Sequence, residues 1–331
     1  MPNQTDKFVS VIIPCRNEQK FIGACLDSLL AQDYPKDKME ILVVDGMSED
    51  GTRETVKKYS EKYPFIKLVD NPKKHTPFAL NIGVKTARGD VIAVTGAHSM
   101  LNKPEILMRI DAHASYKNNY ISKSVEYLKK YDADNVGGIM KTLPRSNKVI
   151  TRAIALALSS FFGVGNSIFR TGANEPRVVD TVFGGCYRRE VFDKVGLFNE
   201  NLVRSQDMEL NLRLKKAGGK TMLTPDIVSY YYPKDNLKDF FTHNFQDGIW
   251  AIYPLKFTKT PLRFRHYVPL LFVLTLPLSV WPYIPASLFF SAKIALREKD
   301  WRLFFALPLA FAARHFGYGL GSILGLIKLI R

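Results

Sequence analysis

Cysteine is scarce in this chain. Three cysteines occur in 331 residues, with no regular spacing. A disulfide framework or a structural zinc site needs patterned cysteines, so the sequence excludes both and indicates a reducing compartment. The opening residues MPNQTDKFVSVIIP also lack a basic segment followed by an apolar one, so we expect no secretory signal.

Two nucleotide motifs are missing as well. The chain contains neither GxGxxG nor GxxxxGK[ST], which counts against a dinucleotide-dependent dehydrogenase and a P-loop NTPase. Acidic residues are outnumbered, with 47 Lys and Arg against 31 Asp and Glu and a net charge of +16. Such a charge indicates an anionic partner. Because the basic residues are dispersed rather than gathered on an aromatic platform, we expect membrane lipids and no nucleic acid.

Long apolar runs lie near the C-terminus, at residues 267–295 and 303–327. A membrane span needs roughly 20 apolar residues, and basic flanks such as KFTKTPLRFRH favour the cytoplasmic side. Residues 257–331 are therefore predicted to form an interfacial linker and a multi-pass membrane region, with the catalytic part facing the cytoplasm. We expect two or three spans, because Pro277, Pro282 and Pro285 interrupt the first run. The alternative is a set of buried core helices.

The N-terminal part alternates apolar strands with helical segments. We expect strands at 9–14, 40–46, 65–70 and 90–95, and helices at 18–31, 52–62 and 77–87. This alternation predicts right-handed βαβ units and a mostly parallel sheet, whose ligands bind at the carboxyl ends of the strands.

The pattern changes after residue 117. Helices are expected at 121–131, 208–217 and 237–252, and strands at 135–140 and 222–233. Residues 151–166 are predicted to form an apolar helix that runs into a glycine-rich turn. The segment 180–192, DTVFGGCYRREVF, is predicted to be a strand, a glycine turn and the start of a helix.

Polar residues follow the first two strands. PCRNE closes the first, and Asp45 ends the second, where its carboxylate can accept hydrogen bonds from a base or a ribose. Gly46 permits close approach of the backbone, and Ser48 offers a capping hydroxyl. The alternative is that this Asp-Gly only makes a turn.

Taken together, the motifs resemble a known family. VSVIIPCRNE, EILVVDGMSEDGT, ALNIGVKTARGD and SQDMEL, in this order and spacing, resemble the family 2 glycosyltransferases. RIDAHASY, ADNVGG and LVRSQDMELNLRLKKAGG are most similar to the membrane-associated, succinoglycan-biosynthesis type of glucosyltransferase. The resemblance covers essentially the whole chain. It implies an α/β catalytic domain of the GT-A fold, Rossmann-like with a mostly parallel sheet, followed by transmembrane helices.

The resemblance also implies that the two halves of the catalytic domain bind different substrates. Residues 1–117 would form the nucleotide-sugar-binding half of the GT-A domain, and residues 118–256 the acceptor-binding, catalytic half. The donor is expected to be a UDP-hexose, and the acceptor a lipid-linked saccharide. The residues implied for the nucleotide sugar are Pro14, Arg16, Asn17, Glu18, Asp45, Gly46, Ser48, Asn81 and Asp111.

Asp207 in SQDMEL stands where the family places its catalytic base. Inversion at the anomeric carbon is a direct displacement, so one base must deprotonate the acceptor hydroxyl. Glu209, two residues further on, would point elsewhere on a helix. The alternative for Asp207 is a helix N-cap.

The resemblance assigns the acceptor and the diphosphate to Gly184, Gly185, Gln206, Gln246 and Trp250. In FGGCY the alternative is a plain turn. In FQDGIW, Ile249 stands where related processive synthases have Arg, and the alternative is a Trp on an interfacial helix.

The family's metal motif has two candidates fifteen residues apart. DVIAVTGAHS contains His98 but has Gly96 in place of a carboxylate, whereas EILMRIDAHA supplies Asp111 and His113. Both ligand types suit Mg²⁺ or Mn²⁺, and imidazole favours Mn²⁺. We expect Asp111 and His113 to bind the metal, with His98 as the second choice and a site without metal as the third.

The sequence therefore predicts an inverting hexosyltransferase that uses a nucleotide sugar, a divalent metal and a lipid-linked or polysaccharide acceptor at the cytoplasmic membrane face. The alternative is a degenerate, nucleotide-sugar-binding scaffold of a polysaccharide-assembly complex. Gly96, Gln206 and Ile249, which depart from the family pattern, motivate that second hypothesis.

Overall fold

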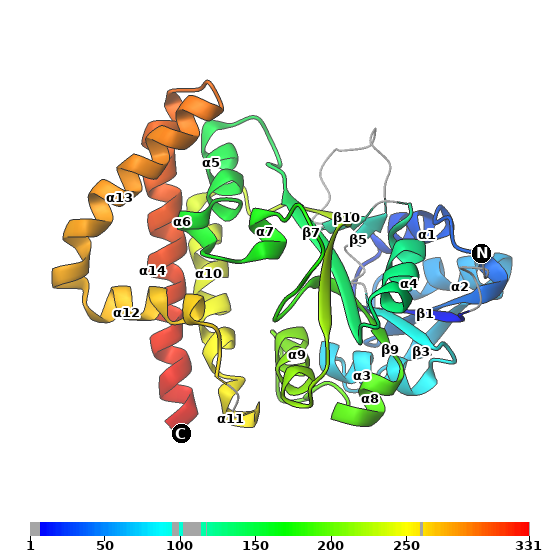
Figure 1. Ribbon diagram of the computed structural model, residues 1–331. Helices are drawn as coiled ribbons and strands as arrows, with labels where there is room; N and C mark the ends of the chain where they lie inside the picture. Colours follow the sequence, from blue (N-terminus) through cyan, green and yellow to red (C-terminus); the bar gives the residue numbers. More distant parts are fainter. Residues whose placement is uncertain (1–6, 95–98, 102–113, 117, 259–260, 331) are drawn as a thin grey trace. The chain divides into compact units, whose positions relative to one another are not determined.

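The computed structural model describes residues 7–94, 99–101, 114–116, 118–258 and 261–330. The chain divides into two compact units, shown by sequence colour in Figure 1. The first comprises Met1–Met140 with Ala173–Tyr230, and the second comprises Lys141–Gly172 with Tyr231–Arg331. The expected functional division at residues 117 and 256 stays a prediction.

Parallel strands begin the first unit, as the sequence predicts. The order β3-β2-β1-β4 combines β1 (Val9–Cys15), β2 (Met39–Asp45), β3 (Ile66–Asp70) and β4 (Val91–Val94). Both β1 and β2 are almost wholly buried, which explains their unbroken runs of Val, Ile and Leu. The register pairs Cys15 with Asp45 and Asp45 with Asp70, so the three strands end at one edge.

Helices cover both faces of this sheet. Alternate residues of a strand point to opposite faces, and the core divides accordingly. One face packs on α1 (Ile22–Leu30), α2 (Thr52–Lys62) and α4 (Tyr120–Lys130). The other packs on α3 (Thr76–Thr86), α8 (Glu190–Val195) and α9 (Gln206–Lys216).

Antiparallel strands extend the sheet beyond β4. β9 (Phe183–Arg188) pairs antiparallel with β4 and with β7 (Asn135–Thr142). The sheet is completed by β10 (Thr221–Tyr231), β8 (Arg177–Val178) and the short parallel pair β5 (Ser99–Leu101) and β6 (Ala114–Tyr116). The predicted glycine turn in 180–192 is wrong, because Gly184 and Gly185 lie inside β9.

Helices build the second unit. The predicted helix over 151–166 is interrupted at Ser159 and Ser160, so α5 (Val149–Leu158) ends there, and the Ser160 hydroxyl accepts a hydrogen bond from Gly163 N–H that begins α6 (Phe161–Val164). The remaining elements are α7 (Ile168–Thr171), α10 (Leu237–Ile252), α11 (Leu255–Thr258), the 3-10 turn Phe264–His266, α12 (Val268–Leu274), α13 (Leu276–Arg297) and α14 (Arg302–Ile330). Helix α10 has the bounds that the sequence predicts.

Helices α10 and α14 pack with their backbones close together. Gly317, Gly321 and Gly325, spaced four residues apart on α14, face the backbone of α10. A Cβ atom added at Gly321 would lie 2.0 Å from the carbonyl oxygen of Phe245. The glycine spacing is therefore a packing requirement of this helix pair.

Replacing Gly321 by Ala is expected to destabilise the second unit by about 2 kcal/mol, since overfilling a tight contact forces backbone shifts. Thermal unfolding measures the effect. Gly23→Ala in α1 is the matched control, because the added Cβ would meet its nearest atoms at 3.8 Å, an ordinary contact. That change should be neutral or stabilising. Equal melting temperatures for both variants would contradict the close packing of α10 and α14.

The apolar C-terminal helices differ from the expectation. The first apolar run bends by 115° between α12 and α13, at Thr275. Pro277 occupies the first turn of α13, where a missing N–H costs nothing, while Pro282 and Pro285 lie inside the helix. The predicted interruption by the last two prolines is therefore wrong.

By length and composition, one helix in the described part of the chain, Arg302–Ile330, is able to cross a membrane. The bent pair from Phe264 to Arg297 would count as a second span if its two arms act as one.

Candidate active site

Three loops meet at the carboxyl edge of the parallel strands. The loop after β1 begins at Arg16 and includes Asn17 and Glu18, the loop after β2 holds Gly46 to Ser48, and a third follows β3. Pro14 lies near the end of β1 itself. The register brings Cys15, Asp45 and Asp70 side by side, so the structure gathers the predicted residues of the first two loops. This edge is where ligands bind in open parallel sheets.

Hydrogen bonds lock the first two loops together. The Asn17 N–H donates to the Ser48 hydroxyl at 2.8 Å, and the Glu49 N–H donates to the Asn17 side-chain oxygen at 2.9 Å. Asn17 and Met47 both have left-handed backbone angles, with φ of 54° and 55°. That conformation is costly for a residue with a Cβ, so these contacts hold both loops in a fixed shape.

Asp45 is fully buried, and its carboxylate already has partners. One oxygen accepts hydrogen bonds from Arg53 Nη1 at 2.7 Å and from the Ser48 N–H at 2.9 Å, and the other accepts from the Ser48 hydroxyl. Arg53 also donates to Asp70 at 2.8 Å. These hydrogen bonds, first to Asp45 and then to Asp70, raise the pKa of the Arg53 guanidinium. Direct contact of Asp45 with a base or ribose stays a prediction.

Arg53 was missed by the sequence analysis. It lies in the first turn of α2, eight residues after Asp45. A basic residue shortly after a strand that ends in Asp is a usable signal, because the parallel geometry returns the following helix over that strand end. The ion pair through Arg53 joins the ends of β2 and β3.

Gly46 and Asn71 shape the meeting point of the three loops. A Cβ at Gly46 would lie 3.2 Å from the Arg16 side chain and 3.2 Å from the carbonyl oxygen of Lys74. Asn71 is buried, donates from its N–H to the Asp45 carbonyl at 2.8 Å, and has a side-chain oxygen without a hydrogen-bond partner among the described residues.

Asn81 lies on α3 and bridges to a distant loop. Its side chain donates to the Phe198 carbonyl at 2.9 Å and to Glu200 at 3.0 Å, and it accepts from the Phe198 N–H at 2.9 Å. The anchored loop leads into α9. In the described structure Asn81 thus positions the approach to Asp207, and its contact with a nucleotide sugar stays a prediction.

Asp207 stands in the first turn of α9. The helix begins at Gln206, and Ser205 rather than Asp207 occupies the cap position, with φ of 60°. The Asp207 side chain is exposed, yet the protein around it desolvates the carboxylate and raises its pKa, while hydrogen bonds from the N–H groups of Met208 and Asp207 oppose this. An accessible carboxylate with a raised pKa suits a general base.

Glu209 has a different environment from Asp207. It is 2 % exposed and forms two parallel hydrogen bonds with Arg213, of 2.7 Å and 2.8 Å. Arg213 also donates to the Leu197 carbonyl at 2.7 Å. This buried pair fixes α9 against the preceding loop and leaves Asp207 as the acid at the helix start that faces solvent.

The other acceptor-side candidates lie in both units. A Cβ at Gly185 would lie 2.5 Å from the Asn135 side-chain oxygen, so the glycine permits close packing inside β9. Gln206 donates to the Val203 carbonyl at 2.8 Å. Gln246 and Trp250 lie on α10 in the second unit, where the Trp250 ring packs edge-on against Tyr253 with centroids 5.6 Å apart. Gly184, in β9, has φ of 59°.

The expected metal ligands lie outside the described residues, since these exclude 95–98 and 102–113. His98, Asp111 and His113 all belong to those ranges. Among the residues the structure describes, no group of three His, Cys, Asp or Glu is arranged to hold a metal ion. Strands β5 and β6 follow the two Ala-His motifs, and their register pairs Ser99 with Ala114, fifteen residues apart like the motifs themselves.

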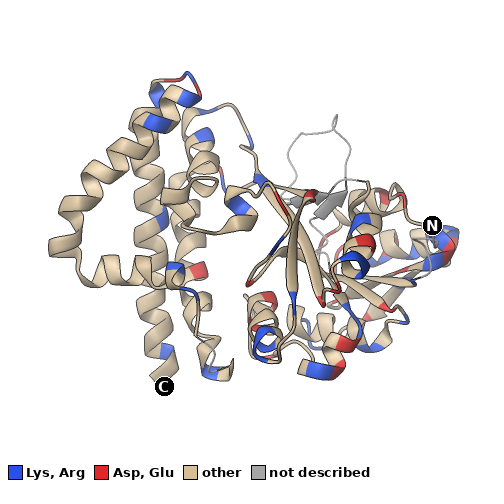
Figure 2. Ribbon diagram, viewed as in Figure 1, with Lys and Arg blue, Asp and Glu red and all other residues tan. Residues whose placement is uncertain are grey.

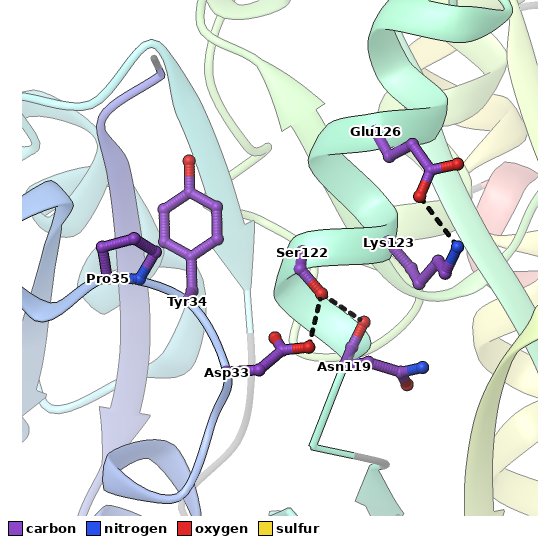
Figure 3. A pocket seen from close by; sticks show the side chains of 7 residues that line it. All are labelled: Asp33, Tyr34, Pro35, Asn119, Ser122, Lys123 and Glu126. Atoms are coloured by element: carbon purple, nitrogen blue, oxygen red, sulfur yellow. Dashed lines mark hydrogen bonds and ion pairs between the residues drawn. The ribbon is translucent and has the colours of Figure 1, made fainter. Parts of the chain in front are cut away.

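One pocket of about 430 Å³ lies elsewhere in the first unit (Figure 3). Asp33, Tyr34 and Pro35 line it from the loop before β2, opposite Ser122, whose hydroxyl donates to Asp33 at 3.0 Å. Because β2 runs from Met39 to Asp45, its length of roughly 20 Å separates this pocket from the carboxyl edge. The pocket is therefore distinct from the candidate site.

Comparison with known proteins identifies the family. The family model described as Glycosyl transferase family 2 matches residues 10–196. A dolichyl N-acetyl-α-D-glucosaminyl phosphate 3-β-D-2,3-diacetamido-2,3-dideoxy-β-D-glucuronosyltransferase from Methanococcus voltae is 31% identical over 97% of this chain and 98% of its own length. The chain belongs to glycosyl transferase family 2.

A second relative and a solved structure also match this family 2 glycosyltransferase over most of their lengths. Succinoglycan biosynthesis protein ExoA of Rhizobium meliloti (strain 1021) is 29% identical over 88% of this chain and 86% of its own length. The fold is similar to that of the mannosyltransferase PcManGT from Pyrobaculum calidifontis, solved with GDP-Man and Mn²⁺, with a TM-score of 0.64, 19% identity and coverage of 99% and 90%. The glycosyltransferase thus has a GT-A-like α/β fold.

Proposed function

We propose that this family 2 glycosyltransferase transfers a hexose, with inversion, from a UDP-sugar to a lipid-linked or polysaccharide acceptor at the cytoplasmic face of a membrane. The observation that carries the proposal is the exposed Asp207 on α9, in the same unit as the three loops at the carboxyl edge of the sheet. A carboxylate with a raised pKa is a suitable general base, and loops held in a fixed shape are suited to binding a nucleotide.

The donor loops would act by positioning. The proposed nucleotide-sugar contacts come from the ends of the first two strands and the loops after them: Pro14, Arg16, Asn17, Glu18, Asp45, Gly46 and Ser48. The side-chain oxygen of Asn71 is an added hydrogen-bond acceptor. Hydrogen bonds between these loops preorganise them, so that little conformational entropy is lost on binding. The structure of S. aureus TarS 1-349 with UDP-GlcNAc, similar to this chain with a TM-score of 0.52 and 16% identity, supports a nucleotide-sugar donor.

Asp207 would remove the proton from the acceptor hydroxyl as that oxygen attacks the anomeric carbon. One carboxylate suffices for direct displacement, and the sugar is released from the diphosphate in the same step. Gly184, Gly185, Gln206, Gln246 and Trp250 are the proposed neighbours of the acceptor and the diphosphate. A bound divalent metal would supply positive charge to the departing diphosphate.

Two observations support a lipid-linked acceptor. The names of the relatives refer to a dolichyl phosphate sugar and to succinoglycan biosynthesis. Apolar side chains are also exposed on α12, on α13, in the turn between α13 and α14, and on the first half of α14. Figure 2 shows few charged residues along α12 and α13 before that turn. The largest exposed fractions belong to Leu278 at 78%, Trp281 at 74%, Leu296 at 79% and Trp301 at 73%. A surface of this kind favours membrane lipid as its partner.

A donor screen tests the function. Full-length protein is incubated with Mn²⁺ or Mg²⁺, a polyisoprenyl-linked acceptor and a panel of UDP- and GDP-sugars, and release of the nucleoside diphosphate is measured. We expect release from one UDP-hexose and none from the Asp207→Asn variant. Absence of release from every donor would favour the scaffold hypothesis, which Gly96, Gln206 and Ile249 motivate.

The metal ligands are tested by binding. We expect His113→Ala to weaken the affinity for Mn²⁺ in the presence of UDP at least tenfold, because losing one of two protein ligands removes a direct bond. His98→Ala should keep the affinity. Isothermal titration with each variant measures the difference, and the reverse pattern would assign the site to the first Ala-His motif.

A further inference from the structure

Basic side chains gather around a buried tyrosine in the second unit. The Arg170 guanidinium lies 5.3 Å from the centre of the Tyr231 ring, which is 8% exposed. Arg145 lies within electrostatic range of the same ring and donates to the Tyr232 carbonyl at 3.4 Å. Two segments far apart in sequence, before α5 and in α7, thus bring cations to one place.

Two more arginines border this place. The Arg314 guanidinium, on α14, lies 5.2 Å from the centre of the Tyr318 ring, and Arg265 lies within electrostatic range of that ring. His266 is hydrogen-bonded to the Tyr318 hydroxyl at 2.9 Å, which holds the 3-10 turn against α14. Arg170 and Arg314 act on each other electrostatically, so the two pairs are neighbours. We call Arg145, Arg170, Arg265 and Arg314 the arginine cluster.

One carboxylate, that of Asp247, interacts with more than one basic residue of this region. Asp247 on α10 lies 3.8 Å from Arg314 and 3.6 Å from His243, and it also acts on Arg170. The other contact of Arg314 is a neutral one, to the side-chain oxygen of Asn244. Arg170, Arg314 and His243 therefore share the carboxylate of Asp247.

Arg170 carries a hydrogen-bond donor that the described residues leave unsatisfied. Its Nη1 atom is buried and has no hydrogen-bond partner among the residues the structure describes. Desolvation, with a smaller contribution from Arg314, lowers the pKa of Arg170 to about 10. A buried N–H of a charged group is costly to leave unsatisfied, and an anion in front of it would restore both the hydrogen bond and the charge balance.

The surroundings indicate which anion. A guanidinium fork matches the oxygens of a phosphate, so a phosphoryl group fits the chemistry. Arg265 directly precedes α12, whose Val268, Leu271 and Leu274 are 46%, 46% and 58% exposed. Phosphate-binding groups and an exposed apolar face within a few residues of each other suit a molecule that joins a phosphate to a hydrocarbon chain.

We propose that the arginine cluster binds the phosphate of a polyisoprenyl-linked acceptor, while the exposed face of α12 takes its first isoprene units. The inference rests on the proposed function and deepens it, because it assigns the acceptor's lipid phosphate to residues separate from the donor loops. Arg170 supplies the buried N–H, Arg314 and Arg265 approach from the apolar side, and Arg145 completes the charge.

The test is the affinity of full-length protein in detergent for farnesyl phosphate, with farnesol and inorganic phosphate as partial probes. We expect Arg170→Gln and Arg314→Gln each to weaken farnesyl phosphate binding at least tenfold, with little change for farnesol. Arg297→Gln is the matched control, since Arg297 is 66% exposed and pairs with Glu298 at 2.9 Å outside the cluster. Its affinity should equal that of the unaltered protein. Equal affinity in Arg170→Gln would overturn the proposal.

Further arms separate the sources of phosphate. If Arg170→Gln loses binding to phosphatidylglycerol vesicles as strongly as to farnesyl phosphate, the cluster is a general lipid site and the proposal is rejected. If excess UDP displaces farnesyl phosphate, the cluster belongs to the donor and the proposal is rejected. If Arg170→Gln unfolds, the melting temperatures of Arg170→Lys and of the unaltered protein, each with farnesyl phosphate or farnesol, replace the affinity measurement. We expect farnesyl phosphate, but not farnesol, to raise the melting temperature of both, and failure to do so counts against the cluster.

Binding of UDP to the unaltered protein is measured in parallel. A protein that binds farnesyl phosphate through Arg170 but binds neither UDP nor GDP retains this inference and rejects the proposed function. A protein that binds UDP and releases it from a UDP-hexose, but binds farnesyl phosphate independently of Arg170, retains the function and rejects the inference.

Discussion

Replacing Asp207 by Asn is expected to lower sugar transfer about a thousandfold, because a positioned general base contributes roughly 10²- to 10⁴-fold to such a step. Asparagine keeps the shape of the side chain and removes its basicity. The measurement is single-turnover transfer to a polyisoprenyl-linked acceptor, with UDP affinity recorded beside it. We expect UDP affinity to change little, so that the loss falls on the chemical step.

The pH dependence of the same reaction follows from the environment of Asp207. Its pKa is raised by desolvation, so the base is protonated at acidic pH and the rate should rise with pH through a midpoint above the ordinary aspartate value. The stability effect has the opposite sign. Since the folded chain holds this proton more tightly than the unfolded chain, the carboxylate's contribution to stability falls as pH rises from about 3.9 through the folded pKa.

Asp207→Asn should therefore melt at the same temperature as the unaltered protein or slightly higher at neutral pH. Glu209→Gln is the comparison variant. It disturbs the buried pair with Arg213, so it should lower stability while the pH midpoint of its residual activity stays in place. A variant of Asp207 that retains most of the transfer rate would exclude this residue as the base.

Replacing Arg53 by Met is expected to destabilise the first unit by about 3 kcal/mol. Asp45 is fully buried and forms an ion pair with Arg53 at 2.7 Å. Removing one partner of a buried pair leaves a desolvated charge, which typically costs 3–5 kcal/mol. The low end applies because the Arg53 side chain is 22% exposed and water can reach its place. Chemical unfolding gives the free energy, and UDP titration gives the consequence for the donor loops.

A double-mutant cycle identifies the cause. Adding Asp45→Asn to Arg53→Met removes the unpaired charge, so the double variant should recover much of the lost stability. Lys74→Met is the control in the same loops, because Lys74 forms only a long, exposed pair with Glu49 at 3.8 Å and should change stability by less than about 0.5 kcal/mol. A fully additive double variant would show that Arg53 stabilises the loops by packing alone.

The sequence predicted the parallel half of the fold well, for a physical reason. Fully buried strands such as β1 and β2 have unbroken apolar runs, and α2 and α10 have strong helical periodicity with turn residues at both ends, so local signals define them. The glycines of FGGCY were misjudged because a glycine inside a strand has the local signature of a turn. What keeps them in β9 is the pairing of this strand with β4 and β7, which are distant in the chain.

The candidate site was predicted in part. Strand-end residues such as Asp45 and Ser48 could be located from the order of the elements alone. Arg53, Asn71 and the bridge from Asn81 to Phe198 were not found, because each acts through a partner from another βα unit or another half of the chain. The arginine cluster around Arg170 is of the same kind, since its members come from four separate segments.

The glycine contact between α10 and α14 has a consequence for anyone who wishes to shorten this protein. A fragment ending at residue 256 would keep α10 but lose α14, exposing Ile249 and Ile252, which contact Gly325 and are each at most 4 % exposed in the whole chain. Helix α10, which carries Gln246 and Trp250, would then have a solvent-exposed apolar face. The apolar C-terminus is therefore no detachable anchor, and soluble truncation should yield aggregated rather than simplified protein.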